Sequence, residues 1–155
     1  MTRMTRVFAS YASADEDLAC RLLELLEEHL RASRRGYGMW EFRRLLVGER
    51  WHERIQEEIA ACDVGLLLLS PAFLASEYIA RHELPHFVEG EGKPIVPVGL
   101  KLVDLARHDH KGLADYQVFR LDGRSFSQLR TPGRERFVLD LFRQIEARVD
   151  QCQTA

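Results

Sequence analysis

The chain has 155 residues, of which 46% are hydrophobic and 30% are charged, enough to bury the core of one ordinary domain. Its formal net charge of -2 argues against binding to nucleic acid or to an anionic membrane, because proteins with such partners usually carry a basic excess. The sequence has neither the apolar core of a secretory signal nor an apolar run of about 18 residues, so we expect a cytoplasmic protein without a membrane span.

Short β-rich or apolar runs alternate with helical patterns along the chain. Strands are expected at residues 6–11, 37–42, 64–69, 94–100 and 116–121, and helices at about 13–32, 51–61, 71–88 and 133–149. The third run, VGLLLL, has no polar alternation, which is typical of a strand covered on both faces. This order predicts an α/β sandwich with a parallel sheet, in a single domain that spans residues 1–155 with its core at about 6–149.

The loop after the second expected strand carries apolar residues between arginines. Its sequence is RRLLVGER, in which Arg43 and Arg44 precede Leu45, Leu46 and Val47. Apolar side chains on a loop tip pack either onto their own domain or onto a partner. Ligands of parallel α/β sheets bind beyond the carboxyl ends of the strands, so we expect this loop to border the ligand cleft.

The segment from His82 to His86 spells H-E-x-x-H, the helical signature of zinc proteases. Pro85 lies in the turn that would bring both imidazoles to one metal, where it removes a backbone donor and crowds the preceding turn. No third ligand is offered by an ordered element, and the three cysteines lack a zinc-type spacing, so we expect no metal site. Glycine-rich phosphate loops and the G-x-S-x-G element of hydrolases are also missing from the sequence.

Four blocks of sequence, in a consistent order and spacing, point to one family. They are VFASYASAD, RRLLVGERW, CDVGLLLLSPAFLASEYI and HELP. Together they resemble the bacterial TIR (Toll/interleukin-1 receptor) domain over nearly the whole chain. The resemblance implies a flavodoxin-like domain with a five-stranded parallel sheet, strand order 2-1-3-4-5, covered by helices on both faces. Many bacterial members are NAD⁺ glycohydrolases, often the effector domains of antiphage defence systems.

The resemblance places the catalytic glutamate of the family at Glu83, on the helix after the third strand. NAD⁺ is then the substrate, no cofactor is needed, and the products are nicotinamide and ADP-ribose or a cyclic ADP-ribose. The chemistry is reasonable for a single carboxylate, because nicotinamide leaves a cationic substrate as a neutral molecule and needs no general acid. The carboxylate holds the ribose hydroxyls and stabilises the oxocarbenium-like charge.

The resemblance also implies the residues around the substrate. In this family an aromatic residue one turn before the glutamate stacks on the substrate. Tyr78, or Ile79 by strict spacing, takes that place, and the interval from Tyr78 to Glu83 is five residues instead of four. The other residues expected to bind substrate are Tyr11, Ala12, Ser13, Leu46, Gly48 and Trp51.

TIR domains assemble through the loop that follows the second strand, which here gives an assembly loop of Arg43, Arg44, Leu45, Leu46 and Val47. The expected partners are other TIR protomers, in a homo-oligomer or filament, and a fused or associated sensor module. The alternative is a non-catalytic TIR adaptor, a signalling scaffold that acts only by TIR–TIR association. An inward-facing Glu83 favours the enzyme, because an adaptor has no need of it.

Overall fold

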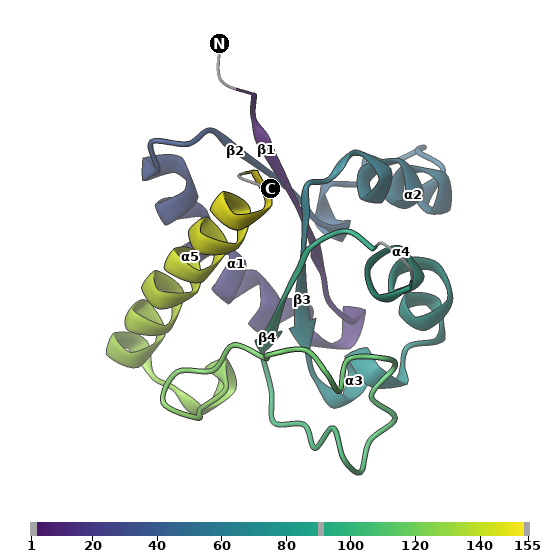
Figure 1. Ribbon diagram of the computed structural model, residues 1–155. Helices are drawn as coiled ribbons and strands as arrows, with labels where there is room; N and C mark the ends of the chain where they lie inside the picture. The colour runs from purple at the N-terminus through teal and green to yellow at the C-terminus, as the bar shows by residue number, and fades with distance from the viewer. Residues whose placement is uncertain (1–2, 90–91, 154–155) are drawn as a thin grey trace.

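A parallel sheet of four strands, in the order β2-β1-β3-β4, forms the centre of the molecule (Figure 1). The computed structural model describes residues 3–89 and 92–153. The strands are β1 (Thr5–Ser10), β2 (Tyr37–Trp40), β3 (Val64–Leu69) and β4 (Ile95–Gly99). Each neighbouring pair runs parallel, so the predicted α/β architecture with a parallel sheet is confirmed.

Helices cover both faces of the sheet (Figure 1). One face carries α1 (Glu16–Ala32) and α5 (Thr131–Gln153), and the other carries α2 (Trp51–Ala61), α3 (Pro71–Ala75), the π-helical turn η3 (Ile79–Glu83) and α4 (Pro85–Val88). Short 3₁₀ turns lie at η1 (Ser13–Asp15), η2 (Phe42–Arg44) and η4 (Phe126–Gln128). Within the described ranges, no helix has the length and apolar content of a membrane span.

The central strand β3 supplies side chains to both apolar layers. Leu66 and Leu68 pack toward α1 and α5, whereas Leu67 and Leu69 pack toward α2, α3 and α4. Every residue of β3 is buried, which confirms that this strand is covered on both faces. The alternation follows from the two-residue period of a strand, which turns successive side chains to opposite faces.

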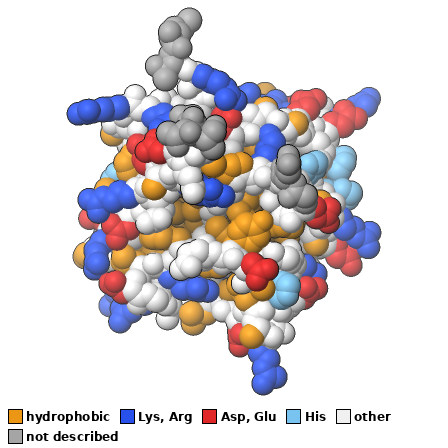
Figure 2. Space-filling model, in the orientation of Figure 1, with side chains coloured by type: hydrophobic (Ala, Val, Ile, Leu, Met, Phe, Trp, Pro, Cys, Tyr) orange, Lys and Arg blue, Asp and Glu red, His pale blue; other side chains and the backbone are white. Residues whose placement is uncertain are grey.

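The prediction of a fifth strand at residues 116–121, and with it the order 2-1-3-4-5, was wrong. This segment meets β4 at a single parallel bridge, between Val98 and Phe119. A groove of about 520 Å³ lies along the outer edge of β4 in place of a full ladder. In the space-filling view, apolar side chains gather at the centre of this face (Figure 2).

Backbone hydrogen bonding explains why the fifth ladder does not extend. The Phe119 N–H donates to the Pro97 carbonyl at 2.8 Å, so the polar groups of Pro97 face the outer edge. Pro97 has no N–H, so it cannot donate the next hydrogen bond that a parallel ladder to this segment would need on the N-terminal side of the bridge. Beyond the bridge, the Leu121 N–H donates to the Arg124 carbonyl in a tight turn and is unavailable to β4.

The helix expected over 71–88 forms instead as three short helical pieces. Ser70 caps α3, since its hydroxyl oxygen accepts a hydrogen bond from the Phe73 N–H at 3.0 Å. The chain then turns and re-enters helix at η3, where the Leu84 N–H donates to the Ile79 carbonyl five residues earlier. Pro85 begins α4 directly after this wide turn, at a first helical position where its missing N–H is tolerated.

A buried carboxylate ties together the carboxyl ends of three strands. Asp15, in the connection after β1, accepts a hydrogen bond from the Ser70 hydroxyl at the end of β3. Its other oxygen lies 2.6 Å from Nζ of Lys101, which follows β4. The Asp15 side chain is almost fully buried, so its contact with Ser70 acts in a medium of low dielectric constant, whereas the Lys101 side chain is 41% exposed and its contact is partly screened by water.

We expect Asp15→Ala to lower the free energy of unfolding by about 2 kcal/mol, because it leaves the buried Ser70 hydroxyl without its acceptor, whereas the partly exposed Lys101 ammonium can turn to water. Denaturant unfolding at pH 7 measures the loss. Asp17→Ala, at an exposed position in the first turn of α1, is the matched control and should change stability by about 0.5 kcal/mol or less. Equal losses in the two variants would contradict the role given to Asp15.

Candidate active site

A cavity of about 230 Å³ opens beyond the carboxyl ends of β1 and β2, against α2 and η3. The sequence-predicted residues that line it are Tyr11, Ala12, Ser13, Trp51, Tyr78, Ile79 and Glu83. The fold therefore brings together three segments that are far apart in the sequence. This is the edge at which parallel α/β sheets bind their ligands.

Two residues predicted to bind substrate lie outside this cavity. Leu46 is 71% exposed at the tip of the loop, and Gly48 makes the turn beside it with a positive φ of 94°. In a single chain, neither residue belongs to the wall on which Glu83 lies.

The cavity also has walls that were not predicted from the sequence. Phe8 and Trp40 stack against each other with ring centroids 5.7 Å apart, and both line the cavity. Ser10 lies two residues after Phe8 on the same strand and faces the cavity as well. The two-residue period of β1 was the available signal, because it puts Phe8 and Ser10 on one face.

Glu83 is buried in this cavity without a countercharge. Only 7% of the residue is exposed, and within the described ranges no cationic side chain forms an ion pair with it. Burial raises the pKa of Glu83 to about 7, whereas the hydroxyl of Ser10 favours the ionised form. The carboxyl group is therefore close to half ionised at neutral pH.

The π-helical turn explains the five-residue interval between Tyr78 and Glu83. The hydrogen bonds of a π-helix join residues five apart, whereas those of an α-helix join residues four apart. Residues five apart in a π-helix are therefore about one turn apart and can face the same side. Tyr78 immediately precedes η3 and Glu83 ends it, so the extra residue is absorbed and both side chains line the same cavity. Ile79 lines the cavity too, but it is buried in the apolar core.

Aromatic and imidazole rings form the rim of the cavity. The ring of Tyr78 lies 5.2 Å from that of Trp51 and 4.9 Å from that of His82, measured between centroids. Nδ1 of His52 lies 2.9 Å from the Tyr78 hydroxyl oxygen, and partial burial raises the pKa of that hydroxyl. The rim thus presents flat, polarisable surfaces to a ligand.

The two histidines of the H-E-x-x-H segment have other neighbours in the structure. The His82 ring packs edge-on against His52 at 4.9 Å, and Nε2 of His86 lies 2.9 Å from the side-chain oxygen of Gln56. Glu83 between them faces the cavity. In the part of the chain that the structure describes, no group of three or more His, Cys, Asp or Glu side chains is arranged to hold a metal ion.

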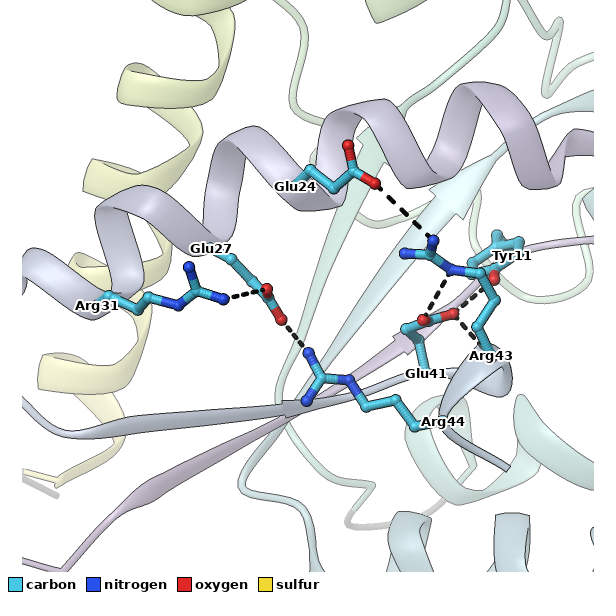
Figure 3. Close-up of polar contacts among 7 residues, drawn as sticks. All are labelled: Tyr11, Glu24, Glu27, Arg31, Glu41, Arg43 and Arg44. Atoms are coloured by element: carbon cyan, nitrogen blue, oxygen red, sulfur yellow. Dashed lines mark hydrogen bonds and ion pairs between the residues drawn. The ribbon is translucent and has the colours of Figure 1, made fainter. Parts of the chain in front are cut away.

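A buried glutamate joins the base of the assembly loop to the cavity wall (Figure 3). Glu41, at the end of β2, accepts a hydrogen bond from the Tyr11 hydroxyl at 2.5 Å and from Nε of Arg43 at 3.0 Å. Burial and this contact with Glu41 raise the pKa of Tyr11, so its hydroxyl stays protonated and donates. Glu41 was not predicted to take part in the site.

Ion pairs to α1 hold the same loop base from the other side (Figure 3). Arg43 lies 3.9 Å from Glu24, and Arg44 pairs with Glu27. The three apolar residues that follow differ in their burial. Leu45 is partly buried and packs onto its own domain, whereas Leu46 and Val47 are exposed.

A parallel α/β sheet in the order β2-β1-β3-β4, with a cavity at the carboxyl ends of its strands, is typical of the flavodoxin-like class of domain. Residues 7–132 match the family model of the TIR domain, and the chain therefore belongs to the TIR domain family. An uncharacterised protein of Sinorhizobium fredii, y4lF, is 36% identical over 106 residues, which make up 65% of this chain and 32% of that relative. The chain thus spans about a third of the length of this relative.

We expect Glu83→Gln to stabilise the protein at alkaline pH. The folded pKa of about 7 lies above the ordinary value of 4.5, so the contribution of Glu83 to stability is complete below pH 4.5 and is lost as the pH rises through 7. One pKa unit corresponds to about 1.4 kcal/mol, so the variant should gain about 3 kcal/mol at pH 8 and less than about 1 kcal/mol at pH 5.

Denaturant unfolding at the two pH values measures this difference. Glu77→Gln, which neutralises an exposed carboxylate on the segment just before η3, is the control and should show no gain that grows with pH. If the difference in the free energy of unfolding between Glu83→Gln and the wild type were the same at both pH values, Glu83 would ionise in the folded chain as it does in water.

Proposed function

We propose that this TIR domain is an NAD⁺ glycohydrolase that cleaves the bond between nicotinamide and ribose, with Glu83 as its catalytic carboxylate. The observation that carries the proposal is the burial of Glu83, without a countercharge, in a cavity with an aromatic rim. The products are nicotinamide and ADP-ribose or a cyclic ADP-ribose. NAD⁺ is the substrate, and no cofactor takes part.

The position of Glu83 suits the charge changes of this reaction. The pyridinium ring of NAD⁺ is cationic, so its entry favours the ionised form of Glu83 and lowers the pKa of that carboxyl. As the glycosidic bond breaks, positive charge moves from the ring to the ribose and nicotinamide departs as a neutral molecule. A carboxylate already fixed in a medium of low dielectric stabilises this oxocarbenium-like charge and holds the ribose hydroxyls.

The size of the cavity supports a site that is shared between protomers. Pockets that enclose a small ligand usually measure about 300–1,000 Å³, and the cavity of about 230 Å³ is too small for a whole dinucleotide. We therefore place the nicotinamide riboside half against Glu83, Trp51 and Tyr78. The remainder of NAD⁺ extends over Ala12 and Ser13 toward the loop of a neighbouring protomer.

A second TIR protomer fits the exposed tip of the assembly loop. Leu46 and Val47 project into solvent, while ion pairs to α1 hold the arginines that precede them. Leu46 and Gly48, which do not reach the cavity of their own chain, then contact the substrate bound by the next protomer. The assembled enzyme is a homo-oligomer or filament in the cytoplasm, which acts without a membrane or nucleic acid.

The proposed biological setting is an effector in bacterial antiphage defence, with activation by a fused or associated sensor module. The relative y4lF is longer than the part matched here, which supports a TIR domain that works beside further segments. The second candidate function is a non-catalytic adaptor that acts through TIR–TIR association. The exposed loop tip supports the adaptor and the enzyme equally well, whereas the buried Glu83 favours the enzyme.

Incubation of the purified protein with NAD⁺ tests the enzyme directly. We expect nicotinamide release, measured by chromatography, to fall at least about 100-fold in Glu83→Gln, because the transition-state charge loses its carboxylate. The control Glu77→Gln should keep full activity. Below pH 7, kcat/KM should rise about tenfold per pH unit and then level off as Glu83 ionises.

Equal release by the wild type and Glu83→Gln would exclude Glu83 as the catalyst. Absence of release from the wild type, even in crowded and concentrated solution, would favour the adaptor.

The shared site predicts that activity depends on protein concentration. Nicotinamide release per molecule should increase as the protein is concentrated, and Leu46→Glu combined with Val47→Glu should abolish that increase by adding repulsive charge to the contact. Sedimentation velocity on the same samples reports the assembly. Leu102→Glu, at another exposed apolar position, is the control. Activity per molecule that stays constant over a wide range of concentration would argue against a shared site.

A further inference from the structure

Ser10 is a buried hydroxyl whose place in the structure is not explained by the rest of the fold. It is the last residue of β1, only 2% of it is exposed, and it lines the cavity together with Glu83. Within the described residues its oxygen has no hydrogen-bond partner that satisfies ordinary geometry. A buried hydroxyl without a partner costs about 1–3 kcal/mol, so an alanine would suit the packing better.

Two tyrosine hydroxyls on this wall are already engaged, whereas the indole N–H of Trp40, which also lines the cavity, is buried without a partner within the described residues. The Tyr11 hydroxyl donates to Glu41 at 2.5 Å, and the Tyr78 hydroxyl oxygen lies 2.9 Å from Nδ1 of His52. Glu16, the remaining carboxylate on the cavity wall, is exposed at the start of α1. Of the hydroxyls of Ser10, Tyr11 and Tyr78, that of Ser10 alone has no partner within the described residues, and it lines the same cavity as Glu83.

We propose that Ser10 is a positioning residue of the candidate active site, whose hydroxyl donates a hydrogen bond to the Glu83 carboxylate and fixes it toward the substrate. Its catalytic importance rests on the proposed function, although the contact itself does not. Donation to a carboxylate strengthens as the carboxylate ionises, since a charge-assisted hydrogen bond is about twice as strong as a neutral one. Ser10 therefore opposes the effect of burial on Glu83 and enlarges the reactive fraction at neutral pH.

Carboxyl NMR tests the contact in the free protein. With ¹³C-labelled glutamate, the Glu83 signal is identified by its loss in Glu83→Gln and is titrated from pH 4 to 9. Removal of the donor in Ser10→Ala should raise the pKa of Glu83 by about one unit, whereas Ser10→Thr, which keeps a hydroxyl, should not. Ser10→Cys keeps nearly the same volume but is a weak donor, so it should behave like Ser10→Ala.

Two controls separate this effect from a general disturbance. Ser127→Ala removes an exposed hydroxyl far along the chain, and the other glutamates report in the same spectra. An unchanged pKa of Glu83 in folded Ser10→Ala or Ser10→Cys would overturn the proposal.

The activity measurement distinguishes failure of this proposal from failure of the proposed function. In an active enzyme, the rise of kcat/KM with pH should move to higher pH in Ser10→Ala by the amount seen in the NMR titration. A purely structural role would lower activity without moving the profile, and that result would overturn the proposal. If the protein releases no nicotinamide, the NMR titration alone decides whether Ser10 acts on Glu83.

Discussion

The candidate site depends on one unfavourable arrangement, an ionisable carboxyl that is removed from water without a cation beside it. At neutral pH the burial of Glu83 costs about 3 kcal/mol relative to a neutral residue, which is a large part of the 5–15 kcal/mol that keeps a domain folded. The rest of the structure tolerates this cost through two apolar layers and the buried contacts of Asp15. An exposed Glu83 would destabilise the folded state less. It would also stabilise a nearby positive charge poorly, because water screens the interaction between the two charges.

The sequence was sufficient to predict a parallel α/β sheet covered by helices and the edge of that sheet at which the cavity opens, but not the number of strands. The apolar run of β3 indicated a covered central strand, and the position of Glu83 indicated an inward carboxylate. Pro94 and Pro97 indicated an edge strand or an irregular ladder, but the loss of the fifth strand also depends on which side of β4 the polar groups of Pro97 face. That direction follows from the strand register, which the sequence does not contain.

Other parts of the site were missed for similar reasons. The π-helical turn is defined by one hydrogen bond between residues five apart, and the sequence around Tyr78 only shows an irregular interval. Ser10 and Glu41 are polar residues at the ends of β1 and β2, where a solvent-exposed position is the ordinary expectation. In the folded chain, however, both residues are almost fully buried. Leu46 and Gly48 do not reach the cavity of the same chain, so no intramolecular contact could have revealed a role for them.

The proline at the outer edge of β4 also limits how copies of this protein meet. Sheet edges with regular N–H donors are templates on which further chains add as strands, and such addition leads to open-ended aggregates. Pro97 interrupts that row of donors, and the Gly99 N–H that follows it donates to the Phe119 carbonyl. An exposed loop tip then remains available for association, whereas this edge of the sheet is a poor template for a further strand. Copies of the protein that accumulate locally are therefore less prone to merge their sheets through β4.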